Sequence, residues 1–444
     1  GITALESGTY NDFTNINIGG VTRDGKDGSN ELSFIILEIQ EELHELQPGL
    51  SIHVAEVTPD EFVKAGCRVI RQGHGYPSVF NPDCYVQELV NQGKSLEDAR
   101  EGGCSGCIEV GAFGKEAYVL TGYLNTPKIL EITLNNGWDP NSGKKLGLET
   151  GDPRTFTSYE QLYEAYHKQM LHFVNLKLSV NNYIERMFAL YAPATFLSLF
   201  IDDCITKGKD YYNGGARYNT TYIQCTGLGT TTDCFATIKK HVFEDKRYTM
   251  DELLTAVAAN FEGHEKMRQY IMNRTPFFGN DDEYADTIAV KVYEDLVKAI
   301  KGHPNTRGGE TQLNMLSTTC HNYFGSVCHA TPNGRLAHFA ISDGTSPAHG
   351  ADTNGPTSVI KSLGKLDQTQ SGGTLLNMRF IPALLKREED LDKLVSLIRA
   401  YFKMGGHHVQ FNIVDTQTLL DAQKKPEDSK DLLVRVAGYS DYFN

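Results

Sequence analysis

Hydrophobic positions along the chain recur at two different spacings, and stretches of the two kinds alternate. Residues 31–49 (ELSFIILEIQEELHELQPG) carry apolar side chains at helical spacing and end at Pro-Gly, which predicts a helix. Residues 51–57 (SIHVAEV) are predicted to form a strand. Residues 58–73 begin with Thr-Pro, continue with acidic residues and end at glycine, so they predict a second helix. Residues 95–103 predict a third, between a serine cap and a glycine stop.

The alternation continues to the end of the chain. Residues 158–191 predict a long, partly amphipathic helix, and residues 390–406 a helix that ends at Gly-Gly. Residues 407–415 (HHVQFNIVD) predict a strand with two unlike faces. One face carries Val409, Phe411 and Ile413, and the other carries Gln410, Asn412 and Val414. Helices and strands in this order predict an α/β architecture with a largely parallel sheet.

Glycine-rich segments lie between these elements, and we expect loops there because glycine and asparagine supply the conformations that turns need. The segments are GGARYN (214–219), GLGTTTD (227–233), NTRGGE (305–310), TPNGR (331–335) and SGGTLLN (371–377). None matches a phosphate-binding fingerprint: GxxxxGK[ST] is absent, and GLGTTTD lacks the spacing of a dinucleotide loop. The loops therefore predict turns and not a nucleotide site.

Composition excludes several classes of function. The chain has 444 residues, 40% of them hydrophobic, and a net charge of −14, which argues against a nucleic-acid or anionic-membrane partner. No apolar run reaches the roughly 18–20 residues of a membrane span, and no signal peptide is seen. The nine cysteines are irregularly spaced, which favours reduced thiols in a cytoplasm.

The segment GGCSGCIEVG (102–111) places Cys104, Cys107 and Glu109 close together. A structural metal site needs four ligands at recognisable spacing, and this segment offers two cysteines. A thioredoxin-like dithiol precedes a helix, whereas here the predicted helix comes first. A nucleophilic cysteine needs a base, but Glu109 is an anion that raises the pKa of a neighbouring thiol.

Two interpretations of Cys107 stay open at this point. A neutral thiol suits hydrogen-atom transfer, and Glu109 could exchange a proton at the neighbouring substrate carbon. The alternative is a buried structural cysteine beside a surface acid. In either case Cys104 is expected to be a packing residue, and no metal is expected at the site.

A second motif, RVAGYS (435–440), lies near the end of the chain. Together with GCIE it resembles the glycyl radical enzymes of the pyruvate formate-lyase-like family, whose signatures are a G-C-[VI]-E finger loop and a C-terminal R-V-[AS]-G-[YF] loop. Intervening segments also resemble that family: ARYNTTYIQ (216–224), PNTRGGE (304–310), ATPNGR (330–335), ISDGTSPAHGADTNGPT (341–357), SGGTLLNMRF (371–380) and GGHHVQFNIVD (405–415). The resemblance covers essentially the whole chain.

The resemblance implies that Gly438 stores a radical and that Cys107 uses it. A glycine radical is delocalised over the flanking amide and carbonyl groups, and a side chain would disturb that plane and block approach. No bound cofactor is implied, because the radical is installed on Gly438 by a separate radical-SAM [4Fe-4S] activating enzyme. A small-molecule substrate, a homodimer and the cytoplasm of an anaerobic organism are also implied.

The resemblance also narrows the reaction. Cys107 is followed by Ile108, whereas pyruvate formate-lyase uses two adjacent cysteines. The pocket positions resemble the branch that dehydrates trans-4-hydroxy-L-proline to 1-pyrroline-5-carboxylate. Cys107 would take hydrogen from C5, and Glu109 would assist loss of the C4 hydroxyl.

The implied substrate-binding residues are Ser7, Asp12, Phe13, Tyr123 and Thr318. Phe13 would pack on the ring and the others would hold the amine, carboxylate and hydroxyl groups. Each polar one could instead be an ordinary turn, strand or loop-bracing residue. The alternatives are another eliminating lyase of the family, acting on a diol, glycerol, choline or a sulfonate, and a non-enzymatic radical-domain repair module. Ile108 and Val110 depart from the pattern of the branch.

The fold implied by the resemblance is a ten-stranded α/β barrel of two parallel half-sheets set antiparallel, with the two loops meeting inside. Residues 1–415 would belong to the barrel domain, with the finger loop at 102–111, and residues 416–444 to the glycine radical loop region, truncated at its C-terminus. Family members are nearly twice as long, so we expect a C-terminal portion that is inactive alone. The remaining portion would supply further pocket residues, including a histidine.

Overall fold

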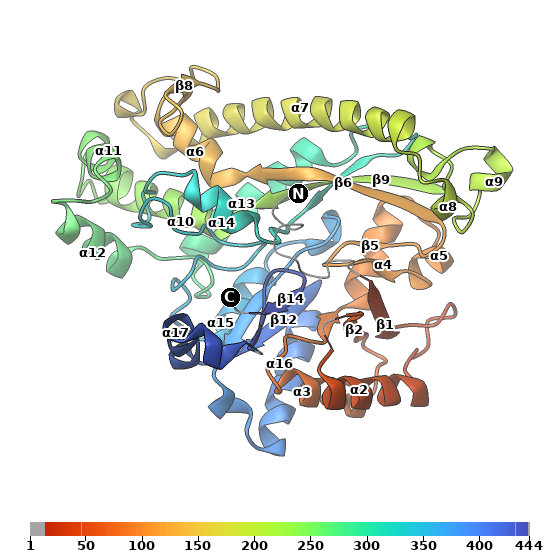
Figure 1. The fold of residues 1–444 in the computed structure, drawn as a ribbon. Coiled ribbons are helices and arrows are strands. Elements are labelled where there is room, and N and C mark those ends of the chain that lie inside the picture. Colours follow the sequence, from red (N-terminus) through yellow and green to blue (C-terminus); the bar gives the residue numbers. More distant parts are fainter. Residues whose placement is uncertain (1–13, 46, 431, 443–444) are drawn as a thin grey trace. The chain divides into compact units, whose positions relative to one another are not determined.

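Two compact units make up the chain, and each contains its own sheet (Figure 1). The computed structural model describes residues 14–45, 47–430 and 432–442. The first unit comprises residues 1–115 and 367–444, and the second comprises residues 116–366. Helices and strands alternate in both, so the predicted α/β class is confirmed.

The first unit contains strands from both ends of the chain. Its strands are β1 (Asn15–Gly19), β2 (Gly49–His53), β3 (Ser78–Phe80), β4 (Gly103–Cys104), β5 (Val110–Gly111), β11 (Asn377–Phe380), β12 (His408–Ile413), β13 (Leu433–Arg435) and β14 (Ser440–Tyr442). Its helices are α2 (Glu31–Leu43), α3 (Asp60–Ile70), α4 (Pro82–Asn91), α5 (Leu96–Arg100), α16 (Glu388–Lys403) and α17 (Thr416–Lys424), with the 3₁₀ turns η4 (Gln368–Gln370), η5 (Pro382–Leu385) and η6 (Pro426–Ser429).

The main sheet of the first unit has five strands in the order β1-β2-β3-β12-β11. Strands β1, β2 and β3 are parallel to one another, and so are β12 and β11, whereas β3 and β12 are antiparallel. Two parallel groups therefore meet with opposite directions, as the resemblance implies for the half-sheets. One face is apolar and includes Ile52, Val79, Val409 and Phe411, all buried. The alternate positions carry polar side chains such as Ser51, Ser78 and Gln410, with Phe80 as an apolar exception, because successive strand residues point to opposite faces.

The second unit is mostly helical. Its strands are β6 (Glu116–Asn125), β7 (Trp138–Asp139), β8 (Lys144–Lys145), β9 (Tyr218–Thr226) and β10 (Thr311–Asn314). Its helices are α6 (Thr126–Leu134), α7 (Tyr159–Tyr191), α8 (Thr195–Ser198), α9 (Cys204–Lys207), α10 (Leu228–Ile238), α11 (Met250–Ala258), α12 (Glu265–Arg274), α13 (Glu283–Ile300), α14 (Cys320–Ser326) and α15 (Pro356–Leu363), with the short elements η1 (Pro153–Thr155), η2 (Tyr211–Asn213) and η3 (Lys239–Glu244), the last a π-helix.

Strands β10, β9 and β6 form a parallel sheet in that order. The PNTRGGE segment ties this sheet to α7 through Arg307, which is buried. Its guanidinium donates to the carbonyl oxygens of Ala117 (2.9 Å) and Thr220 (2.7 Å) and pairs with Glu185 of α7 at 3.3 Å. A buried ion pair needs such additional hydrogen bonds to offset its desolvation, so this motif has a structural role.

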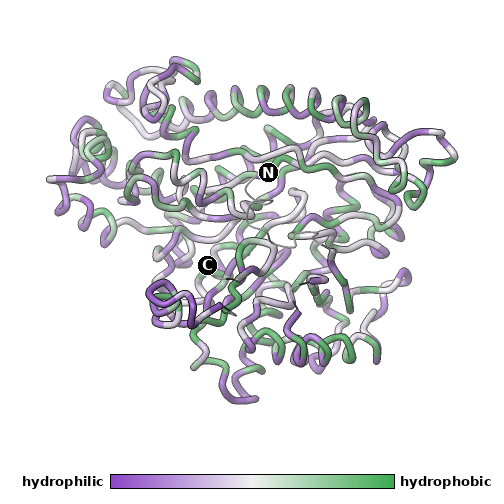
Figure 2. The backbone as a smooth tube through the Cα atoms, in the orientation of Figure 1, coloured by the Kyte–Doolittle hydropathy of each residue, from purple (hydrophilic) through white to green (hydrophobic). Residues whose placement is uncertain are grey.

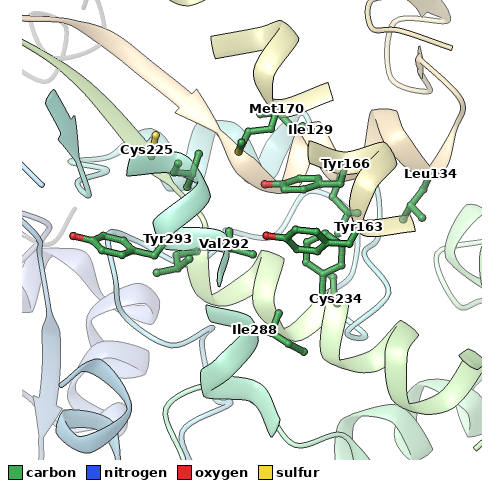
Figure 3. Close-up of a cluster of buried hydrophobic side chains, with 14 of the residues drawn as sticks. Ile129, Leu134, Tyr163, Tyr166, Met170, Cys225, Cys234, Ile288, Val292 and Tyr293 are labelled. Atoms are coloured by element: carbon green, nitrogen blue, oxygen red, sulfur yellow. The ribbon is translucent and has the colours of Figure 1, made fainter. Parts of the chain in front are cut away.

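A large apolar core stabilises the second unit (Figure 3). Tyr163, Tyr166 and Met170 of α7 meet Ile288 and Val292 of α13 in this cluster. Helix α7 is amphipathic, and Figure 2 shows hydrophobic and hydrophilic residues alternating along it. Each large apolar side chain buried here contributes on the order of 1.5–3 kcal/mol, so packing and not helix propensity determines this arrangement.

Several sequence predictions differ from the structure at particular positions. GLGTTTD was expected to be a loop, but helix α10 begins at Leu228. Its threonines are buried, and Thr230 accepts a hydrogen bond from the Ser342 amide at 2.9 Å, so tertiary packing overrides their weak helix propensity. Strand β2 ends at His53, and α2 ends at Leu43, before the predicted ends. TPNGR is confirmed as a turn, with the Gly334 amide bonded to the Thr331 carbonyl.

Candidate active site

Cys107 lies at the tip of a short hairpin in the first unit. Strands β4 and β5 pair antiparallel, with Cys104 opposite Val110, and the Ser105 amide donates to the Glu109 carbonyl at 2.9 Å. Gly102 permits this narrow loop, because a Cβ atom there would lie 2.3 Å from the Gly111 carbonyl oxygen. The Cys107 side chain is buried. Gly102 thus allows the two strands of this hairpin to approach each other closely.

The Glu109 carboxylate turns back toward Cys107. Its Oε2 accepts hydrogen bonds from the backbone amides of Cys107 and Ile108, each at 3.2 Å. The side chain is only 2% exposed, so this carboxylate acts in a region from which water is largely excluded. Both amides orient the carboxylate beside the thiol, where a proton donor or acceptor is required by the predicted chemistry.

The Cys107 thiol is held in its neutral form. Burial raises the pKa of Cys107 well above its usual range, the negative charge of Glu109 raises it further, and Arg435 opposes both. The sequence argument assigned this effect to Glu109 alone, whereas burial is the larger cause because a thiolate loses its hydration inside the protein. A neutral S–H group is what hydrogen-atom transfer requires.

Gly438 lies at the tip of a second hairpin, formed by β13 and β14. Its φ of 96° is one that residues with a side chain rarely adopt. A Cβ atom at this position would lie 2.3 Å from the Cys107 Cβ and 2.5 Å from its Sγ. Glycine is therefore required both by conformation and by space, and its α-carbon approaches the thiol directly.

Arg435 stabilises the second hairpin through contacts of its buried guanidinium. It is fully buried and lies over the Tyr76 ring, 4.7 Å from the ring centroid. Its guanidinium donates to Gln410 Oε1 at 2.7 Å and to the Ser78 and Ser440 hydroxyls. The positive charge of Arg435 lowers the pKa of the Cys107 thiol, against the larger effect of burial.

Tyr123 and Thr318 come together in the second unit. Their hydroxyl oxygens are 2.8 Å apart, and because Thr318 donates to the Ser317 carbonyl at 2.7 Å, the Tyr123 hydroxyl donates to Thr318. Thr318 has a φ of 45°, which is strained for a β-branched residue. Strain of this kind concentrates at functional sites. That both residues bind substrate stays a prediction.

The structure describes only some of the predicted substrate-binding residues, and it shows polar residues near Gly438 to which the sequence analysis gave no role. Ser7, Asp12 and Phe13 lie outside the described residues. The sequence analysis assigned no role to Asn377, Gln410 and Asn412, although it placed Gln410 and Asn412 on the same face of a predicted strand. All three donate to backbone carbonyls of residues 435 and 436.

The described residues contain no group of three or more His, Cys, Asp or Glu side chains placed to hold one metal ion. Among the helices that the structure describes, none has the length and apolar character to cross a membrane.

Comparison with known proteins gives two family matches. The family model described as Pyruvate formate lyase-like matches residues 1–325, and the one described as Glycine radical matches residues 341–444. The second match contains Gly438, and the first contains Cys107 and Glu109. The two hairpins that meet in the first unit therefore come from the two matched segments.

Individual relatives agree with these matches. The chain is 53% identical over 444 residues to the trans-4-hydroxy-L-proline dehydratase of Clostridioides difficile, covering 100% of this chain and 56% of the relative. It is 36% identical over 450 residues to the (2S)-3-sulfopropanediol dehydratase of Klebsiella oxytoca, covering 100% of this chain and 54% of that protein.

Solved structures show the same fold. The structure of the Clostridioides difficile hydroxyproline dehydratase with trans-4-hydroxy-L-proline bound superposes with a TM-score of 0.98 at 53% identity, over 100% of this chain and 56% of that one. The glycerol-bound, B12-independent glycerol dehydratase of Clostridium butyricum gives a TM-score of 0.92 at 37% identity, over 97% and 55%. The chain spans little more than half the length of these relatives. It belongs to the pyruvate formate lyase-like family of glycyl radical proteins.

Proposed function

We propose that the full-length protein is a glycyl radical dehydratase that converts trans-4-hydroxy-L-proline to 1-pyrroline-5-carboxylate and water. The observation that carries the radical chemistry is the approach of the Gly438 hairpin to the buried, neutral Cys107 thiol beside Glu109. The choice of substrate is supported by the 53% identity to a hydroxyproline dehydratase, against 36% to a sulfopropanediol dehydratase.

The proposed reaction begins and ends with the same radical. The Gly438 radical takes the hydrogen atom of the Cys107 S–H group, and the resulting thiyl radical takes one hydrogen atom from C5 of the ring. The C4 hydroxyl then leaves as water with a proton that originates on the ring nitrogen, and the C5=N double bond forms. The radical left on C4 recovers a hydrogen atom from Cys107, which in turn regenerates the Gly438 radical.

Glu109 is the residue proposed to carry the proton. Loss of hydroxide from carbon is slow unless the leaving oxygen is protonated, so a positioned acid accelerates it by about 10²–10⁴-fold. The carboxylate is held beside Cys107 by two backbone amides and is shielded from water. These contacts support a proton-carrying role for Glu109 next to the sulfur that would act on the neighbouring carbon.

The substrate contacts remain proposals. We propose that Tyr123 and Thr318 bind polar groups of the zwitterionic substrate, supported by their mutual hydrogen bond and the strained Thr318 backbone. Ser7, Asp12 and Phe13 are proposed to complete the pocket from outside the described residues. Hydroxyl and aromatic side chains of these kinds suit a small ligand with an apolar ring and charged groups.

Activation and assembly are proposed from the family resemblance. A separate radical-SAM [4Fe-4S] activating enzyme would remove a hydrogen atom from Gly438, and the protein would act as a homodimer. A carbon radical reacts with oxygen, so we propose that the enzyme works in the cytoplasm of an anaerobic organism. All nine cysteines are described, and each is a free thiol.

Product analysis of the activated full-length enzyme tests this proposal. The enzyme is incubated without oxygen with trans-4-hydroxy-L-proline, glycerol or (2S)-3-sulfopropanediol, and the products are identified by mass spectrometry. We expect 1-pyrroline-5-carboxylate from hydroxyproline and no comparable turnover of glycerol or (2S)-3-sulfopropanediol.

Cys107→Ala is the control for the chemical step. It should keep the glycyl radical signal in electron paramagnetic resonance (EPR) and abolish product formation. Preferred turnover of glycerol or the sulfonate would overturn the substrate, and turnover by Cys107→Ala would overturn the thiyl step.

A further inference from the structure

One level of the five-stranded sheet in the first unit is polar on every strand. Asn17 of β1 is in register with Ser51 of β2, Ser51 with Ser78 of β3, and Asn377 of β11 with Gln410 of β12. The antiparallel pairs His408–Phe80 and Val409–Val79 continue to place Gln410 opposite Ser78. We call these five residues, Asn17, Ser51, Ser78, Gln410 and Asn377, the polar row.

The polar row is costly unless each member has a partner. Ser51, Ser78 and Gln410 are fully or almost fully buried, and the opposite face of the same strands is an apolar core. Burying an amide or hydroxyl without a hydrogen bond costs about 1–3 kcal/mol. The partners on this face are the two hairpins that carry Cys107 and Gly438.

The β1 end of the row holds the finger loop. The Asn17 side chain donates to the Cys104 carbonyl at 3.0 Å and accepts from the Cys104 amide at 2.9 Å, so it bonds this residue as a neighbouring strand would. Asn15, one step along the same strand face, donates to the Gly106 carbonyl at 3.0 Å. Ser51 is buried at the same level, and among the described residues its hydroxyl oxygen has no hydrogen-bond partner.

The β11–β12 end of the row holds the glycine loop. Gln410 Oε1 accepts from the Gly438 amide at 3.2 Å and from Arg435 Nε at 2.7 Å, and its Nε2 donates to the Val436 carbonyl at 2.7 Å. Asn377 donates to the same Val436 carbonyl at 3.0 Å. Ser78 accepts from the Arg435 guanidinium. One glutamine thus bonds three residues of the hairpin, including the glycine itself.

We propose that Gln410 is a positioning residue for hydrogen exchange between Gly438 and Cys107, a role that rests on the proposed function. The polar row forms hydrogen bonds to both hairpins. Because both hairpins are bound to the same level of one sheet, the sheet sets the distance between the Gly438 α-carbon and the Cys107 sulfur. The Gln410 bond to the Gly438 amide also fixes the peptide plane over which the radical is delocalised. Hydrogen-atom transfer falls steeply with distance, so a small shift of this loop slows the exchange.

The exchange can be measured without any substrate. In D₂O the Cys107 thiol carries deuterium, and each transfer from sulfur to the Gly438 radical and back can leave deuterium on the glycine. The EPR doublet produced by the remaining α-hydrogen then collapses to a single line. The rate of this collapse reports the Gly438–Cys107 transfer, and the signal intensity reports how much radical was installed.

The test compares full-length, activated Gln410→Met with the unmodified enzyme. Methionine has a similar volume but neither donor nor acceptor for the hairpin. We expect the collapse to slow about tenfold or more, because losing hydrogen bonds of about 1–2 kcal/mol corresponds to that factor. The radical yield should change less than the rate.

Gln169→Met is the matched control. Gln169 is a buried glutamine of α7 that bonds the backbone amide and carbonyl of Leu148 in the second unit, so its removal also frees a loop. We expect the collapse rate of this variant to match that of the unmodified enzyme. Equal slowing by both variants would show a general loss of stability and would overturn the proposal.

Other outcomes separate the inference from the function on which it rests. A Gln410→Met enzyme that exchanges as fast as the unmodified enzyme overturns the positioning role. If Gln410→Met fails to fold, Gln410→Asn carries the test, since it keeps a polar amide but is one carbon too short to bond the Gly438 amide and the Val436 carbonyl as glutamine does. Unchanged exchange in Gln410→Asn would then overturn the role. An unmodified enzyme that exchanges but leaves hydroxyproline unchanged overturns only the proposed substrate.

Discussion

Each unit carries a buried polar level on its sheet, but the two levels bond different partners. In the first unit the polar row bonds the backbone of two loops of the same chain. In the second unit Tyr123 is in register with Gln224, and Gln224 with Asn314, and Tyr123 bonds the strained Thr318. In the described part of the chain, the neighbouring Gln312 has a buried side-chain oxygen without a hydrogen-bond partner.

This difference in hydrogen-bond partners indicates that the two units have different tasks. Polar side chains with several directional bonds hold loops that must approach closely, as in the first unit. Hydroxyl and amide groups at the corresponding level of the second unit are of the kind that bind a small polar ligand. On this interpretation the first unit stores and transfers the radical, and the second supplies substrate contacts. The following predictions test that division.

The largest effect is expected at Gly438 in the first unit. Gly438→Ala should abolish both the radical signal and turnover, because its Cβ would overlap Cys107. Gly405→Ala is the matched control: Gly405 also has a positive φ, 89°, but no atom lies within 4 Å of the added carbon. We expect it to cost about 1–2 kcal/mol of stability and to keep the radical. EPR spin counting compares them, and a radical in Gly438→Ala would refute the storage site.

Changes in the second unit should affect turnover and leave the radical in place. Tyr123→Phe and Thr318→Val each remove one hydroxyl, and we expect kcat/KM for hydroxyproline to fall about 10- to 100-fold. The deuterium exchange of Gly438 should not change, since it needs no substrate. Steady-state kinetics and EPR on the same samples check both points. Slower exchange in either variant would contradict the division of tasks between the units.

Two buried groups, one in each unit, should respond oppositely to pH. Burial lowers the pKa of His53 in the first unit to about 3, so its contribution to stability is present above pH 6.5 and is lost as the pH falls toward 3. Burial raises the pKa of Asp233 in the second unit well above 3.8, so its contribution is present below that value and is lost as the pH rises.

Variants of these residues should flatten opposite sides of the stability profile. His53→Asn should remove pH dependence on the acid side, and Asp233→Asn on the alkaline side, each by up to roughly 1.4 kcal/mol per pH unit. Free energies of unfolding from denaturant titrations between pH 4 and 9 provide the measurement. Parallel profiles for Asp233→Asn and the unmodified protein would show that the Asp233 carboxyl is not held neutral.

The smallest effect on chemistry is expected at Cys104. The backbone amide and carbonyl of Cys104 form hydrogen bonds with the Asn17 side chain. These bonds hold the finger loop and do not depend on the Cys104 side chain. Cys104→Ala should therefore lower stability by about 1–2 kcal/mol through lost packing and change kcat by less than about threefold. Thermal melting and turnover check the two parts. A loss of turnover comparable to that of Cys107→Ala would give the second cysteine a chemical role.

The amino-acid sequence by itself determined the local features of this protein. Alternating helical and strand periodicities predict the α/β class, and GCIE with RVAGYS predicts the radical pair. The need for glycine at position 438 follows from radical chemistry before any geometry is known. The two faces of HVQFNI were also readable, because strand side chains alternate regardless of what lies beside the strand.

Only the tertiary structure decided which distant residues share one level of the sheet. Asn17 and Asn377 lie 360 positions apart in the sequence, and their common level depends on register, which the packing of whole strands and helices sets. The same holds for burial, the main cause of the raised Cys107 pKa, and for the helix that begins inside GLGTTTD. Sequence patterns report local preference, whereas register and burial are properties of the folded chain as a whole.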